Sequence, residues 1–163
     1  MPAVPAALVA ASLLVTSLGA VPDPCQLVTA AEVSSALGSA PSRGKPMGPS
    51  LDEETGAKMW VCSLAVGKMM LSIALAEFAT PAAAGKALTT MASQDPDDEE
   101  IAKMTEQAGL GDRAIWGAMS SGAIWVALED KYLLNLTLTG DIGDGVRYRE
   151  LLKRLASLAL AKL

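Results

Sequence analysis

Carboxylates gathered in one short segment are the residues of this chain best suited to chemistry. Five acidic residues fall within Asp95–Glu100, in the run DPDDEE. Closely spaced carboxylates can bind calcium, and a pair of carboxylates can perform glycoside cleavage without histidine. The run lacks the alternating ligands, mid-loop glycine and distal glutamate of an EF-hand loop, so a solvated loop is the favoured interpretation and no metal is expected.

Histidine is absent from the sequence. This absence removes the commonest general base, the commonest metal ligand and the usual partner of a catalytic serine or cysteine. The glycine-rich run Gly140–Gly145 lacks the lysine of a phosphate-binding loop, and Ser120 and Ser121 have no histidine to activate them. We therefore expect no catalytic residue and no cofactor, and a protein that is not an enzyme.

The two cysteines, Cys25 and Cys62, are predicted to form a disulfide, because paired cysteines are common in exported proteins. In the chain-entropy model, closing a loop of this length contributes roughly 4 kcal/mol to stability. The alternative is two buried free thiols.

Residues 1–20 are typical of a signal peptide. They carry no charge, and they run apolar from Ala6 to Val15 before small residues that suit cleavage after Gly19 or Ala20. The expected location is extracytoplasmic, either periplasmic or secreted, with residues 21–163 forming a single domain. An uncleaved membrane anchor is the alternative, and only then is a membrane expected as a partner. Lipidation is not expected, because Pro24 precedes Cys25.

Composition excludes one class of partner. The net charge of −5 argues against nucleic acid, whose phosphates require an excess of clustered lysine and arginine. Apolar residues make up 51% of the chain and charged residues 19%, which predicts a folded domain and not a disordered one.

Capping signals predict three helices. The first spans Leu27–Gly38, with Thr29 and Glu32 as a capping box. The second runs from Pro81, after the N-cap Thr80, to Ser93, and the third begins near Gly145 behind Asp144. Between the first helix and the first strand, Ser39–Ala57 is rich in proline and glycine, which predicts a long loop that could carry a site.

Alternating hydrophobicity predicts five strands, the first two joined by a tight turn at Gly67 and Lys68. The strands are expected at Met59–Val66, Met69–Phe78, Ile115–Met119, Ala123–Leu128 and Tyr132–Thr139. In the second, large aliphatic residues alternate with Met70, Ser72 and Ala74, so one face of the sheet should be well buried and the other less so. The expected fold class is α+β, an antiparallel sheet of about five strands packed with helices in the order α-β-β-α-β-β-β-α.

Two tryptophans fall on neighbouring predicted strands, Trp116 and Trp125. They could line a groove for an apolar ligand or a peptide, although packing within the core is the commoner use of such residues. The sequence Asn135-Leu136-Thr137 matches a glycosylation acceptor, but it lies inside a predicted strand, so we set it aside.

The run DPCQLVTAAEVSSALG, residues Asp23–Gly38, resembles the opening of a family of small exported bacterial proteins and lipoproteins of unknown function, with the pattern DPCxLxTxxEVxxxLG. The Trp60-x-Cys62 pair inside a strand and the glycine-leucine-glycine-aspartate turn at Gly109–Asp112 fit the same family. The resemblance implies a bridge between Cys25 and Cys62 and an α+β sandwich, and it supplies no catalytic residues.

These observations predict an exported, non-catalytic domain that acts as a binding or protein-interaction module of the cell envelope. The expected partner is a protein or a small apolar ligand, with no nucleic acid. The alternatives are a carboxylate-dependent hydrolase, which would use Asp95–Glu100, and a structural or assembly factor of the envelope.

Overall fold

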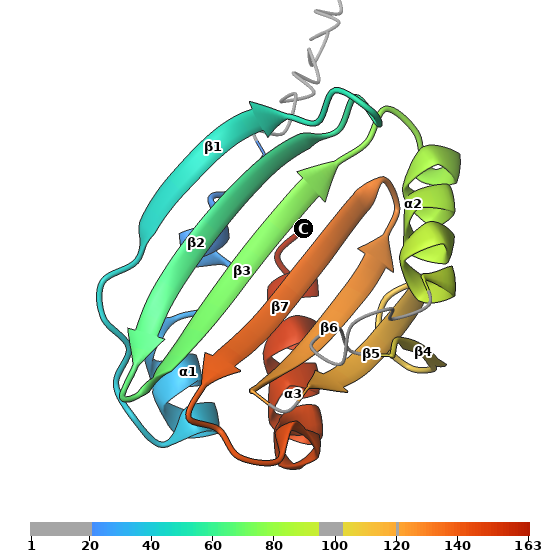
Figure 1. Ribbon diagram of the computed structural model, residues 1–163. Helices are drawn as coiled ribbons and strands as arrows, with labels where there is room; N and C mark the ends of the chain where they lie inside the picture. The colour runs from blue at the N-terminus through green and yellow to red at the C-terminus, as the bar shows by residue number, and fades with distance from the viewer. Residues whose placement is uncertain (1–20, 95–102, 120) are drawn as a thin grey trace, which may run out of the picture.

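The computed structural model describes residues 21–94, 103–119 and 121–163 (Figure 1). The predicted signal segment at residues 1–20 and the acidic run Asp95–Glu100 lie outside the described residues, as does Ser120. Within the described ranges, the chain forms a seven-stranded antiparallel sheet in the order β1-β2-β3-β7-β6-β5-β4. Helices pack on both faces of this sheet.

The elements follow one another along the chain in an order that alternates helices with groups of strands. They are η1 (Pro24–Gln26), α1 (Ala30–Leu37), β1 (Lys45–Leu51), β2 (Lys58–Val66), β3 (Met69–Glu77), α2 (Pro81–Ser93), β4 (Thr105–Gln107), β5 (Arg113–Met119), β6 (Gly122–Glu129), β7 (Tyr132–Gly140), η2 (Gly145–Tyr148) and α3 (Arg149–Leu160).

The prediction of about five strands in the order α-β-β-α-β-β-β-α was wrong, because the sheet has seven strands and two of them were missed. β1 lies within Ser39–Ala57, the predicted loop. It is an edge strand, exposed along its whole length and interrupted by Pro46 and Pro49, so it shows no alternation of apolar and polar residues. β4, the other edge, has only three residues, which is too short for a periodic signal.

The capping signals were confirmed. Thr29 N–H donates to Glu32 Oε2 at 2.6 Å, and Glu32 N–H donates to Thr29 Oγ1 at 3.2 Å. Gly38, with a φ of 76°, ends α1 in the left-handed region that glycine adopts without strain. Thr80 Oγ1 caps α2, and Asp144 caps η2, the short 3-10 helix that leads into α3.

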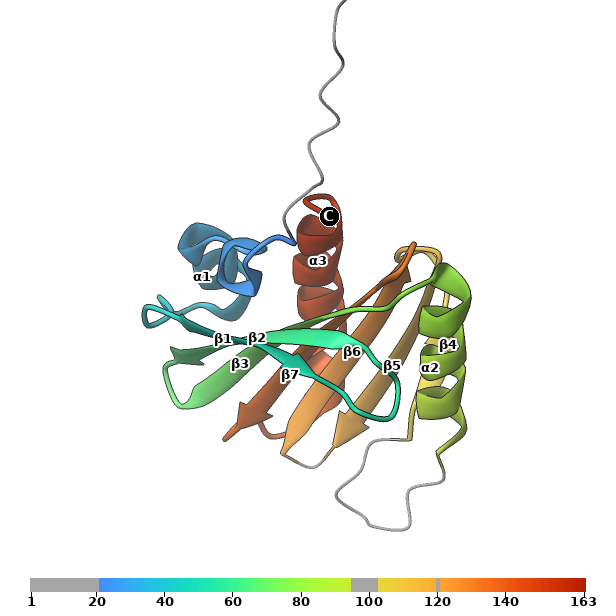
Figure 2. The same ribbon diagram turned by 90° about the horizontal axis from the view of Figure 1, so that it is seen from above.

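One face of the sheet is covered by η1, α1 and α3, as Figure 2 shows from above. Large aliphatic side chains fill this interface, because they point to it at every second position of the central strands. They include Leu71, Ile73 and Leu75 of β3 and Leu134, Leu136 and Leu138 of β7, all with no exposed surface.

The disulfide and the tryptophan pair also belong to this covered face. Cys25 and Cys62 are bonded, which ties η1 to β2 and confirms the predicted bridge. Trp116 and Trp125 face each other on β5 and β6 with ring centroids 5.4 Å apart, and Trp125 Nε1 donates to Arg149 O at 2.9 Å. Both rings are buried, so they pack in the core and line no groove.

The opposite face carries a smaller apolar cluster, where α2 packs over β5, β6 and β7. The cluster is formed by Ala57, Phe78, Ala84, Leu88, Ile115, Val126, Leu128 and Leu133. No described helix covers β1, β2 and β3 on this side (Figures 1 and 2). The residues there are half-buried or exposed, so the predicted contrast between the two faces of the sheet is confirmed.

Candidate functional site

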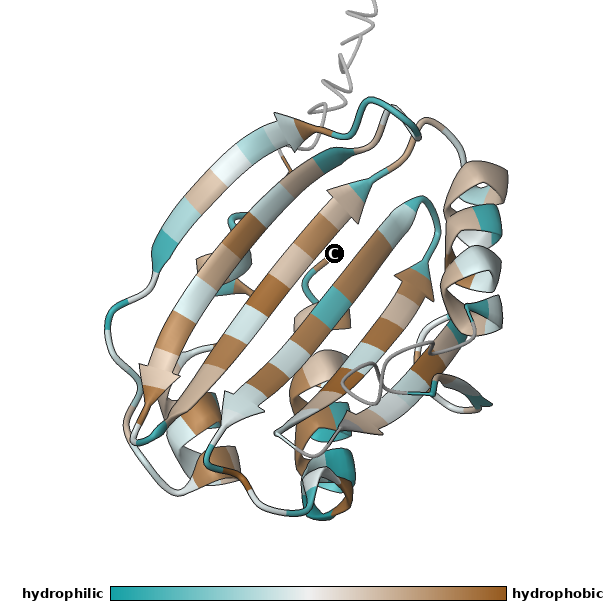
Figure 3. Cartoon of the chain, in the orientation of Figure 1, coloured by the Kyte–Doolittle hydropathy of each residue, from teal (hydrophilic) through white to brown (hydrophobic). Residues whose placement is uncertain are grey.

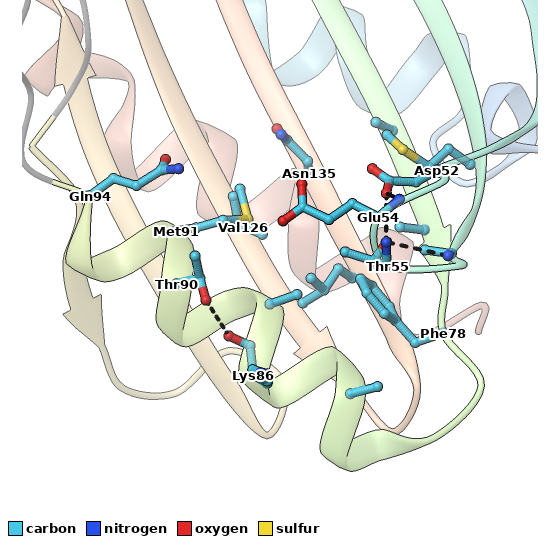
Figure 4. Close-up of a pocket in the computed structure, with 17 residues that line it drawn as sticks. Asp52, Glu54, Thr55, Phe78, Lys86, Thr90, Met91, Gln94, Val126 and Asn135 are labelled. Carbon is cyan, nitrogen blue, oxygen red and sulfur yellow. Dashed lines mark hydrogen bonds between the residues drawn. The ribbon is translucent and has the colours of Figure 1, made fainter.

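The uncovered face is hollowed by a cavity of about 660 Å³, which we call the groove. It lies over β2, β3, β6 and β7, with α2 on one side and the turn at residues 52–57 between β1 and β2 on the other (Figure 4). Its lining consists of Asp52, Glu54, Thr55, Ala57, Met59, Ala74, Ala76, Phe78, Ala83, Lys86, Ala87, Thr90, Met91, Gln94, Val126, Leu133 and Asn135. The volume falls within the usual range of small-molecule sites.

Small side chains create the space at the floor of the groove. Ala74 and Ala76 of β3 stand beside Asn135 and Leu133 of β7, their partners in the antiparallel register. On the covered face the intervening positions of β3 hold leucine and isoleucine, which fill the interface under the helices. Alternate residues of one strand therefore build a packed core on one side and an open floor on the other. Figure 3 shows this as bands of contrasting hydropathy along the strands.

Asn135 is the polar residue of this floor. It is half-buried on the central strand β7, between Ala74 of β3 and Val126 of β6. Its Oδ1 accepts a hydrogen bond of 2.8 Å from Thr137 Oγ1, which orients the amide. Among the residues that the structure describes, Asn135 Nδ2 donates no hydrogen bond, so its N–H donors can bind solvent or a ligand.

Carboxylates stand at the rim formed by the turn. Asp52 Oδ1 accepts from Glu54 N–H at 3.0 Å and from Thr55 N–H at 2.8 Å. The hydrogen bond from the Thr55 backbone is the main reason that the pKa of Asp52 lies below its ordinary value, so this carboxylate is charged at neutral pH. Figure 4 shows Glu54 extending from the turn toward the groove.

The wall on the other side is one face of α2. Ala83 and Ala87 present small side chains to the groove, and Met91 adds a longer apolar one. The hydroxyl of Thr90 donates to Lys86 O at 3.1 Å, within the helix. Lys86, Thr90 and Gln94 are the polar residues of this wall, so polar groups surround the apolar part of the groove.

The groove offers amide, carboxylate, ammonium and hydroxyl groups around an apolar surface. The chain has no histidine, and both thiols are joined in the disulfide. Over residues 21–94, 103–119 and 121–163, no three histidine, cysteine, aspartate or glutamate side chains are grouped closely enough to hold a metal ion. In the same ranges no helix is long and apolar enough to span a membrane.

Of the regions that the sequence suggested as sites, only one contributes described residues to the groove. The end of the segment Ser39–Ala57 forms the rim, as expected of a segment that could carry a site. Trp116 and Trp125 lie on the covered face, away from it. The alternative hydrolase depends on Asp95–Glu100, which lies outside the described residues.

Asn135 was not predicted as a residue of the groove. The sequence analysis considered it only as a glycosylation acceptor. An amide at the centre of an apolar strand, between two leucines, is the signal that could have identified it, because a half-buried polar group needs a partner. The alanines of the floor gave no such signal, since alanine fits any buried strand or helix.

Comparison with family models and with curated proteins finds no match. Among solved structures, the chain is similar to the extracellular domain of PknH from Mycobacterium tuberculosis, with a TM-score of 0.52 and 11% identity over 83% of this chain and 91% of that one. It also aligns with an uncharacterised protein from Mycobacterium smegmatis, with a TM-score of 0.37 and 13% identity over 83% of this chain and 99% of that one. The first comparison establishes a shared fold. The disulfide is consistent with the predicted extracytoplasmic location.

Proposed function

We propose that this chain is a non-catalytic, extracytoplasmic binding domain that holds a small apolar molecule in the groove. The single observation that carries the proposal is the cavity of about 660 Å³ on the uncovered face of the sheet. A cavity with an apolar centre and a few polar groups at its edges is the usual form of a small-molecule site.

The location of the cavity supports binding in preference to structural packing. Seven of the lining residues are alanine or threonine, while the covered face of the same strands holds large aliphatic residues. Filling this space with branched residues would enlarge the core, because buried apolar surface stabilises a domain. The chain instead keeps an apolar hollow in contact with solvent, as a ligand site requires.

Export is supported by two independent features. A disulfide is stable in oxidising compartments and rare in the reducing cytosol. The solved structure with the same fold is the extracellular domain of PknH, and we extend that location to this chain. The absence of histidine and of a free thiol supports a domain that binds without performing a reaction.

The proposal is tested with a neutral fluorescent probe, N-phenyl-1-naphthylamine, whose emission rises in apolar surroundings. We expect the wild-type protein to bind the probe and Ala74→Phe to lose most of this binding, because the phenyl ring would occupy the floor beside Asn135.

Ser72→Phe is the matched control. Ser72 lies two residues away on the same face of β3, next to Thr137, and does not line the groove. Binding retained by Ser72→Phe and lost by Ala74→Phe would support the proposal. No binding by the wild type, or equal binding by the wild type and Ala74→Phe, would overturn it.

A further inference from the structure

The polar groups of the groove narrow the chemistry of the ligand, given that the groove is the binding site. Two kinds of group bear most on the ligand, the amide of Asn135 on the floor and the carboxylates of Asp52 and Glu54 at the rim, while Lys86, Thr90 and Gln94 lie on the α2 wall. A ligand that binds well must accept a hydrogen bond from the amide and avoid repulsion by the carboxylates.

Asn135 favours a ligand that is mostly apolar and carries an oxygen able to accept a hydrogen bond. The bond from Thr137 Oγ1 engages the amide oxygen, so the amide nitrogen is the group available to a ligand. The neighbours of Asn135 across the floor, Ala74 and Val126, are apolar and offer no acceptor from their side chains. A ligand that covered Asn135 with hydrocarbon alone would leave both N–H donors without water or partner, which is unfavourable.

Asp52 and Glu54 disfavour an anion. They give the rim two carboxylates, whereas Lys86 is the lysine of the lining, so the net formal charge of the lining is negative at neutral pH. The charge of the whole chain has the same sign. Repulsion between like charges becomes stronger when a ligand displaces water from the site.

We propose that the groove selects an uncharged amphiphile whose carbonyl oxygen accepts a hydrogen bond from Asn135 Nδ2, and that it discriminates against anionic amphiphiles such as free fatty acids. A fatty-acyl ester or amide with a neutral polar end has this chemistry. Its apolar chain lies on the floor between β3 and α2, and its polar end reaches the solvent at the rim.

The test uses three probes with the same hydrocarbon length. They are monododecanoyl glycerol, which carries an ester carbonyl, 1-O-dodecyl glycerol, which replaces that carbonyl with a methylene group, and dodecanoate at mildly alkaline pH. Each is used below its micellar concentration to displace N-phenyl-1-naphthylamine from the wild type, from Asn135→Leu and from Glu54→Gln.

We expect the wild type to bind the ester roughly threefold to tenfold more tightly than the ether, the usual range for one hydrogen bond. Asn135→Leu should bind both with equal affinity, because it loses the hydrogen bond to the ester and also the cost of covering the amide with the hydrocarbon of the ether. Dodecanoate should bind more weakly than the ester, and Glu54→Gln should narrow that gap. Thermal unfolding of each variant confirms that it is folded.

Equal binding of ester and ether by the wild type would overturn the role of Asn135, as would a preference that persists in Asn135→Leu. Dodecanoate binding more tightly than the ester, through Lys86, would overturn the discrimination against anions. These outcomes leave the proposed function standing as long as Ala74→Phe abolishes binding of all three probes. If none of the three displaces the probe from the wild type, the ligand is not an amphiphile of this class and the inference fails.

Discussion

The two faces of the sheet are built from alternate residues of the same strands, yet they differ in what covers them. On β7, Leu134, Leu136 and Leu138 point to the covered face and have no exposed surface. Leu133, Asn135 and Thr137 point to the groove face, where Leu133 is buried in the cluster under α2 and the other two are half-buried. The covered face also holds the disulfide and the two tryptophans, whose rings are in contact at a tilt. The comparison indicates that the larger part of the core lies on the covered face, while the other face is packed only under α2 and is open beside it.

Removing the disulfide should have the largest effect on stability. The bridge closes a loop over a sequence separation of 37 residues, so replacing both cysteines with alanine should lower the free energy of unfolding by about 4 kcal/mol. Urea denaturation followed by tryptophan fluorescence measures this, with the reduced wild type as the control. A loss under about 1 kcal/mol would show that the covered face does not depend on the bridge.

Two neighbouring residues of β7 allow the contributions of the two faces to stability to be compared. Leu136→Ala should cost about 3 kcal/mol, because it leaves a cavity under α3. Asn135→Ala, one residue away on the groove face, should cost less than about 1 kcal/mol, because the side chain is only half-buried there. Urea midpoints of the two variants give the comparison. Equal losses would contradict the assignment of stability to one face.

Replacing either of two glycines with alanine compares the packing of the two faces, because each change adds a single methyl group. A Cβ at Gly44 would lie 2.5 Å from Cys62 Sγ, so Gly44→Ala should destabilise the protein by about 2 kcal/mol. A Cβ at Gly85, in α2, would meet nothing closer than Leu128 Cδ2 at 3.9 Å, so Gly85→Ala should stabilise the helix by about 0.5–1 kcal/mol. Melting temperatures should move in opposite directions, and a shift of both in the same direction would argue against the difference in packing.

The smallest expected effect is a dependence of stability on pH through α1. The pKa of Glu32 is lowered, chiefly by the hydrogen bond from the Thr29 backbone and further by Thr29 Oγ1 and Lys162. A lowered folded-state pKa stabilises the protein above the ordinary glutamate range, and the stabilisation is lost as pH falls through the folded-state value.

Glu32→Gln should therefore be less stable than the wild type at neutral pH and equal to it in acid. Urea midpoints at several pH values provide the measurement. A difference between the two proteins that stays constant with pH would show that the charge of Glu32 does not contribute.

Most local features of the fold could be predicted from the sequence, because their signals are local. Thr29 and Glu32 mark the start of α1, and Gly67 with Lys68 marks the β2–β3 turn. The alternation in β3 predicted the unequal faces of the sheet. The edge strands could not be predicted in the same way, since β1 is exposed throughout and β4 has three residues. Each is defined by its pairing with the next strand along the chain, β2 or β5, and not by a pattern of its own.

The groove could be predicted only in part. Ser39–Ala57 was expected as a segment that could carry a site, and its end does form the rim. The position of the groove, however, depends on α2 packing over one half of a sheet whose other half stays open, a long-range arrangement with no local signal. The tryptophans were considered as groove residues because they are large, whereas the floor is formed by alanines.

The central claim is that the groove face binds the ligand and the covered face does not. Mapping of amide chemical shifts on the labelled domain, titrated with monododecanoyl glycerol, tests this most directly. We predict that the changes concentrate at Ala74, Ala76 and Asn135 and along the face of α2 that lines the groove. Changes concentrated on α1, on α3 or around Trp116 and Trp125 would contradict the account.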